Sequence, residues 1–401
     1  MAKRFMYVSL VMLIGLLALT SCSRTPHVKP YEEESHLSGN PNDDSYSQEP
    51  CADYEEESCS LENQNGTSYA QVDPHEDKLH PFRDPTHIAS LVMGHGTYMV
   101  IMEDGTLWAW VANDYGSTAP VWVMDNVKMA SSNFDATIAV TKDNTLWAWG
   151  DSLGWLIRDG ETRRSDVPVK VMEDVIFASL GDGHVGVIKS DNSLWTWGPP
   201  SWNDFMEPYF PSTPTLVLEN VAYVSVGTHA MAITEDGALW GWGRNHEGEV
   251  GVGVGLVEGS VDGAWYVPSV SLPPQRIMEN VVQVVAGNEF TGAITADGAL
   301  WTWGNNQVGG VGDGTRTHRF SPVKIMEDVK YVSVHSAIKN DGTLWVWGPS
   351  VFPIQSLELY PVEIMGDVSM ISSVGSILIK TNDGVLWVWD GDNLVPVERY
   401  I

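Results

Sequence analysis

The stretch Asp236-Gly237-Ala238-Leu239-Trp240-Gly241-Trp242-Gly243 recurs in near copies along this chain of 401 residues. The seven copies begin at Asp104, Asp143, Asp191, Asp236, Asp297, Asp341 and Asp383. Each contains Leu-Trp-x-Trp, and these pairs account for fourteen of the eighteen tryptophans. A period of about 45 residues is typical of a repeat architecture. The repeats therefore predict one domain, where length alone would suggest two or three.

One repeat unit, residues 322–348, contains four short apolar segments separated by turn residues. The segments are PVKIM (322–326), VKYVSVH (329–335), SAIKN (336–340) and TLWVWG (343–348). The turn before the last segment is Asp-Gly in five copies and Asp-Asn in the other two, at Asp143-Asn144 and Asp191-Asn192. These residues tolerate the positive φ of a two-residue hairpin. Each unit is therefore predicted to form four antiparallel strands.

The two tryptophans of Leu-Trp-x-Trp are two positions apart, so on a strand they share one face while Leu and x share the other. The x residues are modest in size: Ala109, Ala148, Thr196, Gly241, Thr302, Val346 and Val388. A bulky face can pack on the smaller face of the next sheet, as blades around an axis do. We expect an all-β, seven-bladed β-propeller in which the tryptophans form the blade cores.

The ends of the repeat region predict how the ring closes. The first unit starts at residues 87–91 without a Pro-Val segment before it, whereas the chain ends with Val395-Pro396-Val397 and four further residues. We expect this C-terminal strand to complete the first blade and thereby close the ring, which would remove free sheet edges.

The repeat resembles that of the regulator of chromosome condensation family. The shared pattern is an apolar strand ending in Gly, a G-x-x-H turn, D-G, L-W-x-W-G, N-x-x-G-x-x-G-x-G and a later Pro-Val. The fullest matches are residues 181–198, 242–253 and 303–314. The resemblance covers roughly residues 85–401 and implies a seven-bladed propeller. It does not imply one function, because the fold serves nucleotide exchange, inhibition and adhesion alike.

Residues 1–21 have the basic start and apolar run of an export signal peptide. Leu19-Thr20-Ser21-Cys22 resembles the lipobox of bacterial lipoproteins, in which Cys22 carries a diacylglyceryl group. The alternatives are an ordinary signal peptide or an uncleaved anchor, although the apolar run is short for a spanning helix. We expect a protein that is anchored to a bacterial membrane by lipid and lies outside the cytoplasm.

Residues 22–80 form an acidic segment with fourteen Asp and Glu against three Lys and Arg after Cys22. Such a composition cannot bury enough apolar surface to fold alone, so the segment is predicted to be a disordered tether. Cys51 and Cys59 lie within it and are candidates for one disulfide in an exported protein. Two thiols without nearby histidines are at most half of a metal site.

The propeller region, residues 81–401, is acidic as well, with 38 acidic and 17 basic residues. This charge excludes nucleic acid as a partner, because phosphate binding depends on Lys and Arg. It also opposes flat binding to anionic lipid, so the acyl chains would provide the membrane contact. We expect a monomer.

Antiparallel pairing predicts that the ring has two different ends. The short acidic turns lie at one end, and the second–third turns and the long connections after each W-G lie at the other. Aromatic residues on loops above a rigid scaffold are typical of binding faces. The predicted binding residues at this second end are Trp155, Trp202, Tyr209, Trp265, Tyr266, Phe290, His184 and His229. The alternative for the aromatic residues is that they cap the blades, and for the two turn histidines that they bond the neighbouring backbone.

Catalytic motifs are missing from the sequence. No H-x-x-x-H, H-E-x-x-H or G-x-S-x-G arrangement occurs, so no catalytic residue, metal site or cofactor is predicted. The sequence favours a non-catalytic module that recognises an extracellular or envelope protein, or an envelope or host glycan. The resemblance adds inhibition of a secreted hydrolase, since secreted bacterial propellers of this kind include a β-lactamase inhibitor. The alternative is a glycan-active hydrolase or lyase with carboxylates at the axis. Nucleotide exchange on a GTPase disagrees with the export signal.

Overall fold

A computed structural model describes residues 85–94, 96–113, 116–151, 153–158, 163–199, 211–253, 271–348, 358–389 and 393–397. These residues belong to one compact unit, Lys78–Ile401. The predicted signal peptide and most of the predicted tether, with Cys22, Cys51 and Cys59, fall before it and lie outside the described residues.

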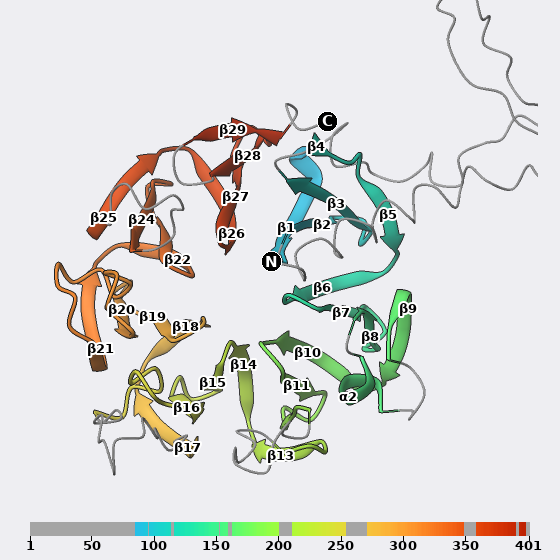
Figure 1. The fold of residues 1–401 in the computed structure, drawn as a ribbon, viewed down its shortest axis with the longest axis horizontal. Coiled ribbons are helices and arrows are strands. Elements are labelled where there is room, and N and C mark those ends of the chain that lie inside the picture. Colours follow the sequence, from blue (N-terminus) through green and yellow to red (C-terminus); the bar gives the residue numbers. More distant parts are fainter. Residues whose placement is uncertain are drawn as a thin grey trace, which may run out of the picture. The chain divides into compact units, whose positions relative to one another are not determined.

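Seven antiparallel sheets are arranged as blades around a central axis (Figure 1). Blade 1 contains β1 (Ile88–Met93), β2 (Thr97–Met102), β3 (Leu107–Asn113), the two-residue β4 (Gly116–Ser117) and β5 (Val121–Met124). Blade 2 contains β6 (Val127–Ser132), β7 (Ala136–Thr141), β8 (Leu146–Gly150) and β9 (Ser165–Met172). Blade 3 contains β10 (Val175–Leu180), β11 (Val185–Lys189), β12 (Leu194–Trp197) and β13 (Thr215–Leu218). Blade 4 contains β14 (Val221–Val226), β15 (His229–Thr234), β16 (Leu239–Arg244) and β17 (Ser271–Met278).

Three further blades complete the ring. Blade 5 contains β18 (Val281–Ala286), β19 (Phe290–Thr295), β20 (Leu300–Gly304) and β21 (Arg319–Met326). Blade 6 contains β22 (Val329–Ser333), β23 (Ser336–Lys339), β24 (Leu344–Gly348) and β25 (Glu358–Met365). Blade 7 contains β26 (Val368–Val374), β27 (Ser376–Thr381), β28 (Leu386–Trp389) and β29 (Leu394–Pro396). A 3-10 turn, η1 (Pro85–His87), precedes β1, and a short helix, α2 (Gly154–Ile157), lies between β8 and β9.

The predicted four-stranded, seven-bladed propeller is confirmed, with the Asp-Gly hairpins in their expected places. Gly237 and Asn144 adopt positive φ, 81° and 64°. The predicted two-residue loop is wrong, however, because the Thr234 N–H donates to the Ala238 carbonyl and residues 235–237 form a three-residue loop. In each blade the chain runs from an inner strand beside the axis to an outer strand at the rim (Figure 1). The turn residues therefore account for the hairpins within each blade.

The predicted exchange of the C-terminal strand is wrong over the described residues. β29 pairs with β28 of its own unit, and blade 1 obtains its outer strand from β5, which pairs with β3. The Pro-Val segment thus ends each unit instead of beginning the next one, because an antiparallel strand pairs most readily with its neighbour in sequence. Proline within β9, β17, β21, β25 and β29 fits this outer position, since an edge strand can lack a ladder N–H.

Side chains close the ring between blades 7 and 1. The buried Lys380 donates from Nζ to the carbonyl oxygens of Thr86 and Ile88, at 3.3 Å each. Val397, just after β29, is buried in a core cluster with Ile88 and other residues of blade 1. The last blade therefore joins the first through packing and hydrogen bonds.

The tryptophan face of each blade packs on the leucine face of the preceding blade, as predicted. Between blades 4 and 5, Trp303 shares a core cluster with Leu239 and Val281. The same pairing recurs for Leu107 with Trp149, Leu146 with Trp197, Leu194 with Trp242, Leu300 with Trp347, Leu344 with Trp389, and Leu386 with Trp110. Large rings filling the space beside small residues give the interblade cores their density.

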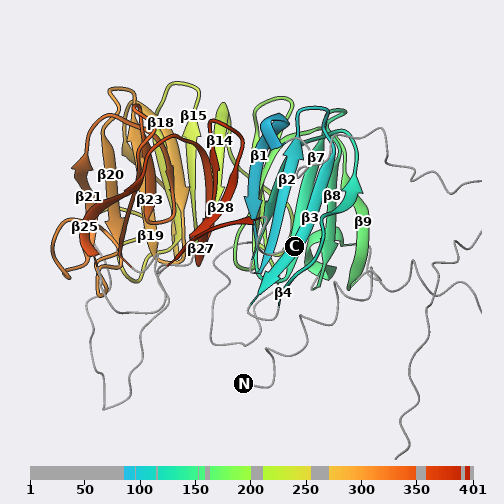
Figure 2. The same cartoon turned by 90° about the horizontal axis from the view of Figure 1, so that it is seen from above.

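The ring has two ends, seen from the side in Figure 2. At the acidic end, defined by the Asp-Gly and Glu-Asp/Asn turns, the Val281 N–H donates to the Gly237 carbonyl of the preceding blade (2.9 Å). Equivalent bonds start from Val127, Val175, Val221, Val329 and Val368. The opposite end, which we call the variable end, holds the turns after the inner strands and the connections to the outer strands.

Replacing Trp303 with Ala should lower the free energy of unfolding by about 3–5 kcal/mol, because its fully buried ring fills the interface between blades 4 and 5. Trp301→Ala is the matched control, since Trp301 lies two residues away and is half-buried. Urea unfolding should show the smaller loss for Trp301→Ala. Equal losses would contradict the assignment of Trp303 as the main filler of this interface.

Candidate binding cavity at the ring axis

A cavity of about 450 Å³ lies at the axis, at the variable end. Its wall comes from six of the seven blades. The lining residues are 132–134, 180–182, 226–227, 286–290, 334–335 and 373–377, with Asn305, Val308 and Gly310 from the connection between β20 and β21. Because this wall is assembled from turns far apart in sequence, the cavity is a product of the closed ring.

Close approach of successive turns shapes the mouth of this cavity. A Cβ atom on Gly181 would lie 2.3 Å from the Gly227 carbonyl oxygen, and one on Gly227 would lie 2.2 Å from that of Gly287. Serine hydroxyls add links between inner strands, as where the Val226 N–H donates to Ser179 Oγ (3.0 Å). Glycine is therefore needed here because backbone meets backbone.

In the turn after the inner strand, one position has positive φ. It is occupied by glycine in some blades and by a residue with a side chain in others. Gly183 and Gly375 have φ of 88° and 77°, whereas Glu289 has φ of 108° and His335 has φ of 52°. Non-glycine residues in such conformations are uncommon and store backbone strain. Both Glu289 and His335 line the cavity.

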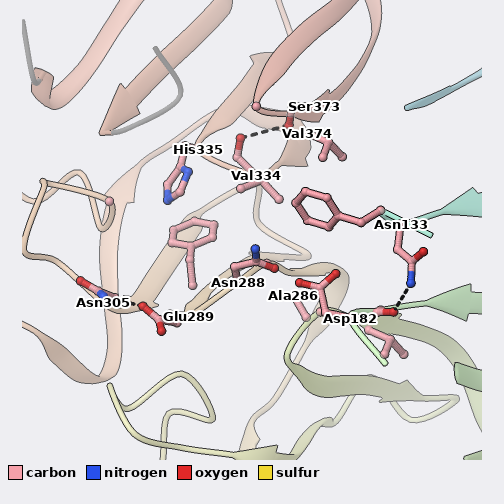
Figure 3. A pocket seen from close by; sticks show the side chains of 18 of the residues that line it. Asn133, Asp182, Ala286, Asn288, Glu289, Asn305, Val334, His335, Ser373 and Val374 are labelled. Carbon is pink, nitrogen blue, oxygen red and sulfur yellow. Dashed lines mark hydrogen bonds between the residues drawn. The ribbon is translucent and has the colours of Figure 1, made fainter. Parts of the chain in front are cut away.

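Asp182 carries an unneutralised carboxyl group in the cavity. Although Asp182 is exposed, partial desolvation in the cavity, and then the nearby Asp135 carboxylate, raise the pKa of Asp182. Within the described residues its side chain joins no hydrogen bond or ion pair, and the same is true of Asn288. Figure 3 shows both side chains projecting into the space enclosed by the labelled residues. These two groups are available to a ligand.

Glu289 is held differently. Its carboxylate accepts hydrogen bonds from Arg244 Nη2 (2.8 Å) and Asn305 Nδ2 (2.7 Å), and Figure 3 shows it turned toward Asn305. Burial opposes ionisation, but these bonds outweigh it and hold the pKa of Glu289 below its usual value. Arg244 also lies 3.7 Å from the fully buried carboxylate of Glu249, whose pKa is raised by burial. Arg244 thus pairs with one carboxylate that lines the cavity, that of Glu289, and with the buried carboxylate of Glu249.

The aspartates of the Asp-Gly and Asp-Asn turns contrast with Asp182 because they stabilise their own turns. Asp236 Oδ1 accepts from Thr234 Oγ1 (2.6 Å) and from the Ala238 N–H (3.2 Å), and these bonds lower the pKa of Asp236. Ser or Thr hydroxyls bond in the same way to Asp104, Asp143, Asp191, Asp297, Asp341 and Asp383. These side chains cap turns and carry no sign of a ligand site.

The predicted binding residues His184, His229 and Phe290 occupy one repeated position, at or just before the second strand. They are buried, with 2%, 0% and 3% exposure, although Phe290 also lines the cavity. His229 Nε2 lies 2.6 Å from Thr291 Oγ1, and the Phe290 ring packs on His335 at 4.4 Å between centroids. The contacts of the two histidines are structural, and their predicted role in binding stays a prediction.

Trp155 lies at the variable end, as predicted. It belongs to α2, and the Asp151 N–H just before that helix donates to the Asp135 carbonyl of the axial turn (2.6 Å). Its ring is half-buried against the core cluster of blades 2 and 3, so part of it caps the blades. Trp202, Tyr209, Trp265 and Tyr266 lie outside the described residues.

Sequence reasoning missed Asp182, Asn288 and Glu289 as site residues. The available signal was their position in the Gly-Asp-Gly and Gly-Asn-Glu turns directly after inner strands, which all end beside the axis. Among the described residues, no group of three or more His, Cys, Asp or Glu could hold a metal ion. None of the described helices is long and apolar enough to cross a membrane.

Sequence comparisons identify the repeat. Models described as "Regulator of chromosome condensation (RCC1) repeat" match residues 236–294 and 297–337, and a second such model matches 281–309. The chain therefore carries RCC1 repeats in these segments, which confirms the resemblance seen in the sequence.

Curated relatives match over short lengths. "Probable E3 ubiquitin-protein ligase HERC4" of Homo sapiens is 32% identical over 103 residues, which are 25% of this chain and 9% of the relative. "RCC1 domain-containing protein RUG3, mitochondrial" of Arabidopsis thaliana is 34% identical over 115 residues, 28% of this chain and 25% of the relative. The matched part thus spans a quarter or less of each relative.

Solved structures share the fold. Prp20p of Saccharomyces cerevisiae superposes with a TM-score of 0.58 at 19% identity, covering 72% of this chain and 81% of that chain. Human WBSCR16 superposes with a TM-score of 0.53 at 18% identity, covering 71% and 84%. The protein is therefore a seven-bladed propeller similar in architecture to these chains.

The buried histidines predict a loss of stability in acid. Burial, and then the His229 charge, lower the pKa of His184 to about 3, and burial followed by Arg244 lowers that of His229 to about 3. An unfolded histidine has a pKa of about 6.5, so below that pH the unfolded chain binds more protons. The contribution of each histidine to the free energy of unfolding should be fully present above about pH 6.5. It should fall by about 1.4 kcal/mol per pH unit as the pH decreases toward 3.

Denaturant unfolding across this pH range provides the measurement. His229→Gln should reduce the slope of the unfolding free energy against pH by about the contribution of one histidine. His87→Gln should not reduce it, because the partly exposed His87 gains its Glu103 ion pair when it is protonated. An unaltered slope in His229→Gln would contradict the neutral, buried state of that imidazole.

Proposed function

We propose that this chain is a non-catalytic binding module that recognises a protein through the variable end of its propeller. The observation that carries the proposal is the axial cavity, because six blades supply its wall and it contains two polar side chains, Asp182 and Asn288, without partners among the described residues. Concave sites with apolar walls and a few convergent polar groups are the usual form of a recognition site.

The comparisons support a protein partner. The structure of Prp20p is described together with its binding properties to Gsp1p and histones, and another neighbouring structure contains Kap60 bound to yeast RCC1. These statements concern those proteins, and we extend to this chain only the idea that an RCC1-type propeller presents a surface to other proteins. The net charge of −30 opposes nucleic acid. A glycan remains the other ligand class that the sequence predicts.

We further propose that the module works outside the cytoplasm of a bacterium, anchored by lipid on Cys22. The support is the sequence of residues 1–22, with its basic start, apolar run and lipobox. Inhibition of a secreted hydrolase is one form that such a function would take, as the family resemblance implies.

A glycan-active hydrolase is the second candidate. Two carboxyl groups at the axis, Asp182 and Glu289, have pKa values shifted in opposite directions, which is a pattern of acid–base pairs. The binding role is favoured because Glu289 is engaged by Arg244 and Asn305 and cannot readily act as a base or nucleophile. Turnover of an envelope glycan that Asp182→Asn abolishes would reverse this preference.

The binding role predicts that a change at the cavity rim removes the partner. The immobilised full chain should capture a protein from envelope or culture-supernatant extracts, and the purified partner should then bind the chain in calorimetry. Val308→Asp should weaken that binding by about tenfold or more, because Val308 lines the cavity and is 38% exposed.

Val282→Asp is the matched control. Val282 is 61% exposed and lies near the acidic end, at the start of β18. Binding should be unchanged in this variant. If Val282→Asp weakens binding as much as Val308→Asp, the variable end is not the recognition surface.

The anchoring proposal predicts a processed and acylated chain. Expressed in a bacterial host, the protein should incorporate labelled fatty acid, and mass spectrometry should find a mature N-terminus at Cys22. Cys22→Ala should remove the label and leave the precursor uncleaved. Recovery of the parent as an unprocessed cytosolic chain would refute the proposal.

A further inference from the structure

We propose that the axial cavity receives a lysine or arginine side chain from the protein partner, with Asp182 as its counter-ion and Asn288, in the same lining, as a neutral acceptor. This inference rests on the proposed binding function and specifies the chemistry of the residue that the cavity recognises. Three observations support it: the negative charge of the cavity, its apolar lining and the surroundings of Asp182.

The charge of the cavity is negative and unbalanced. Asp182 lacks a cationic partner among the described residues, and the residues that line the cavity include no Lys or Arg. Arg244 does not line the cavity and is already held by Glu289 and Glu249. Burial lowers the pKa of His335 to about 4, so its imidazole adds no positive charge near neutral pH. A cation from outside is the complement that this site lacks.

The wall suits the stem of a long basic side chain. Leu180, Val226, Ala286 and Val334 line the cavity from four different blades and present apolar surface. Lysine and arginine combine an apolar stem with a charged head, so the stem can lie along such a wall while the head reaches a carboxylate. Asn288, from blade 5, lines the same cavity, and its amide oxygen is an acceptor for a basic head that has several donors.

The setting distinguishes Asp182 from the many other carboxylates of this chain. At the acidic end the aspartate of each Asp-Gly or Asp-Asn turn accepts a hydrogen bond from a Ser or Thr close to it in sequence. Asp182 instead stands between inner strands of neighbouring blades, where its carboxylate is repelled by Asp135. An uncompensated charge in a concave site is typical of a place where binding supplies the missing interaction.

The test uses three peptides, acetyl-Gly-Gly-X-Gly-Gly-amide with X as lysine, norleucine or glutamate, titrated against the purified full chain. Binding is followed by the NMR signals of the X side chain. The lysine peptide should bind about tenfold more tightly than norleucine, as one charge-assisted contact predicts. Its binding should weaken with added salt, whereas that of norleucine should not. Glutamate should not bind.

Asp182→Asn should remove the advantage of lysine over norleucine, a loss of about tenfold in affinity. Glu219→Gln removes one negative charge at the acidic end, in the turn between β13 and β14, and should leave lysine binding unchanged. Equal affinity of lysine and norleucine, or an unchanged lysine affinity in Asp182→Asn, would overturn the proposal.

A stability measurement separates loss of binding from loss of folding. Because the pKa of Asp182 is raised in the folded protein, its ionised form opposes folding at pH values above that pKa. Asp182→Asn should therefore raise the melting temperature at neutral pH while it abolishes the lysine preference. A lowered melting temperature would show that the carboxylate is structural, and would also overturn the proposal.

Two further outcomes distinguish this inference from the proposed function. If the captured partner still depends on Val308 but no lysine peptide binds, the inference fails and the binding module stands. If butylammonium binds as tightly as the lysine peptide and no protein is captured, the cavity serves a small amine. In that case both the protein partner and the proposed function are refuted.

Discussion

The packing of one tryptophan face against the leucine face of the preceding blade is the contact on which the molecule depends. Every blade presents two apolar faces, so an isolated blade would expose both of them to water. Stacking buries both, and seven such interfaces form seven core clusters. The small x residue beside the leucine packs in the same cluster as the ring, as Ala148 does with Trp197. Steric complementarity of large against small thus sets the spacing of the blades around the axis.

The axial cavity is a consequence of that spacing. Inner strands that are held at a fixed distance by interblade cores must bring their terminal turns together, and glycine at positions 181 and 227 permits the backbones to approach. At the acidic end, bonds such as Val281 N–H to Gly237 O tie each blade to its neighbour. That end is built from short, self-satisfied turns. The variable end is therefore the place where the scaffold can change without loss of the ring.

The site was less predictable than the fold, for a physical reason. Asp182, Asn288 and Glu289 lie in different blades or different parts of a turn, and no local pattern tells which aspartate will lack a partner. The sequence contains many Asp-Gly turns. Only tertiary contacts show that the aspartates at the acidic end accept hydrogen bonds from Ser or Thr hydroxyls, whereas the Asp182 carboxylate is repelled by that of Asp135. The turn histidines posed the same problem, since their burial depends on the neighbouring blade.

The sequence by itself determined the number of blades, the four strands of each and the faces of the tryptophans. These features follow from local rules: period-two alternation, Asp-Gly turns and the recurrence of one motif. Tertiary structure decided which strand completes each blade, how the first and last blades join, and which polar groups meet at the axis. The sequence around Pro396 is compatible with pairing to the first blade or to the last blade. In the structure, β29 pairs with β28 of the last blade. Such features depend on contacts between residues far apart in the chain, which no local pattern encodes.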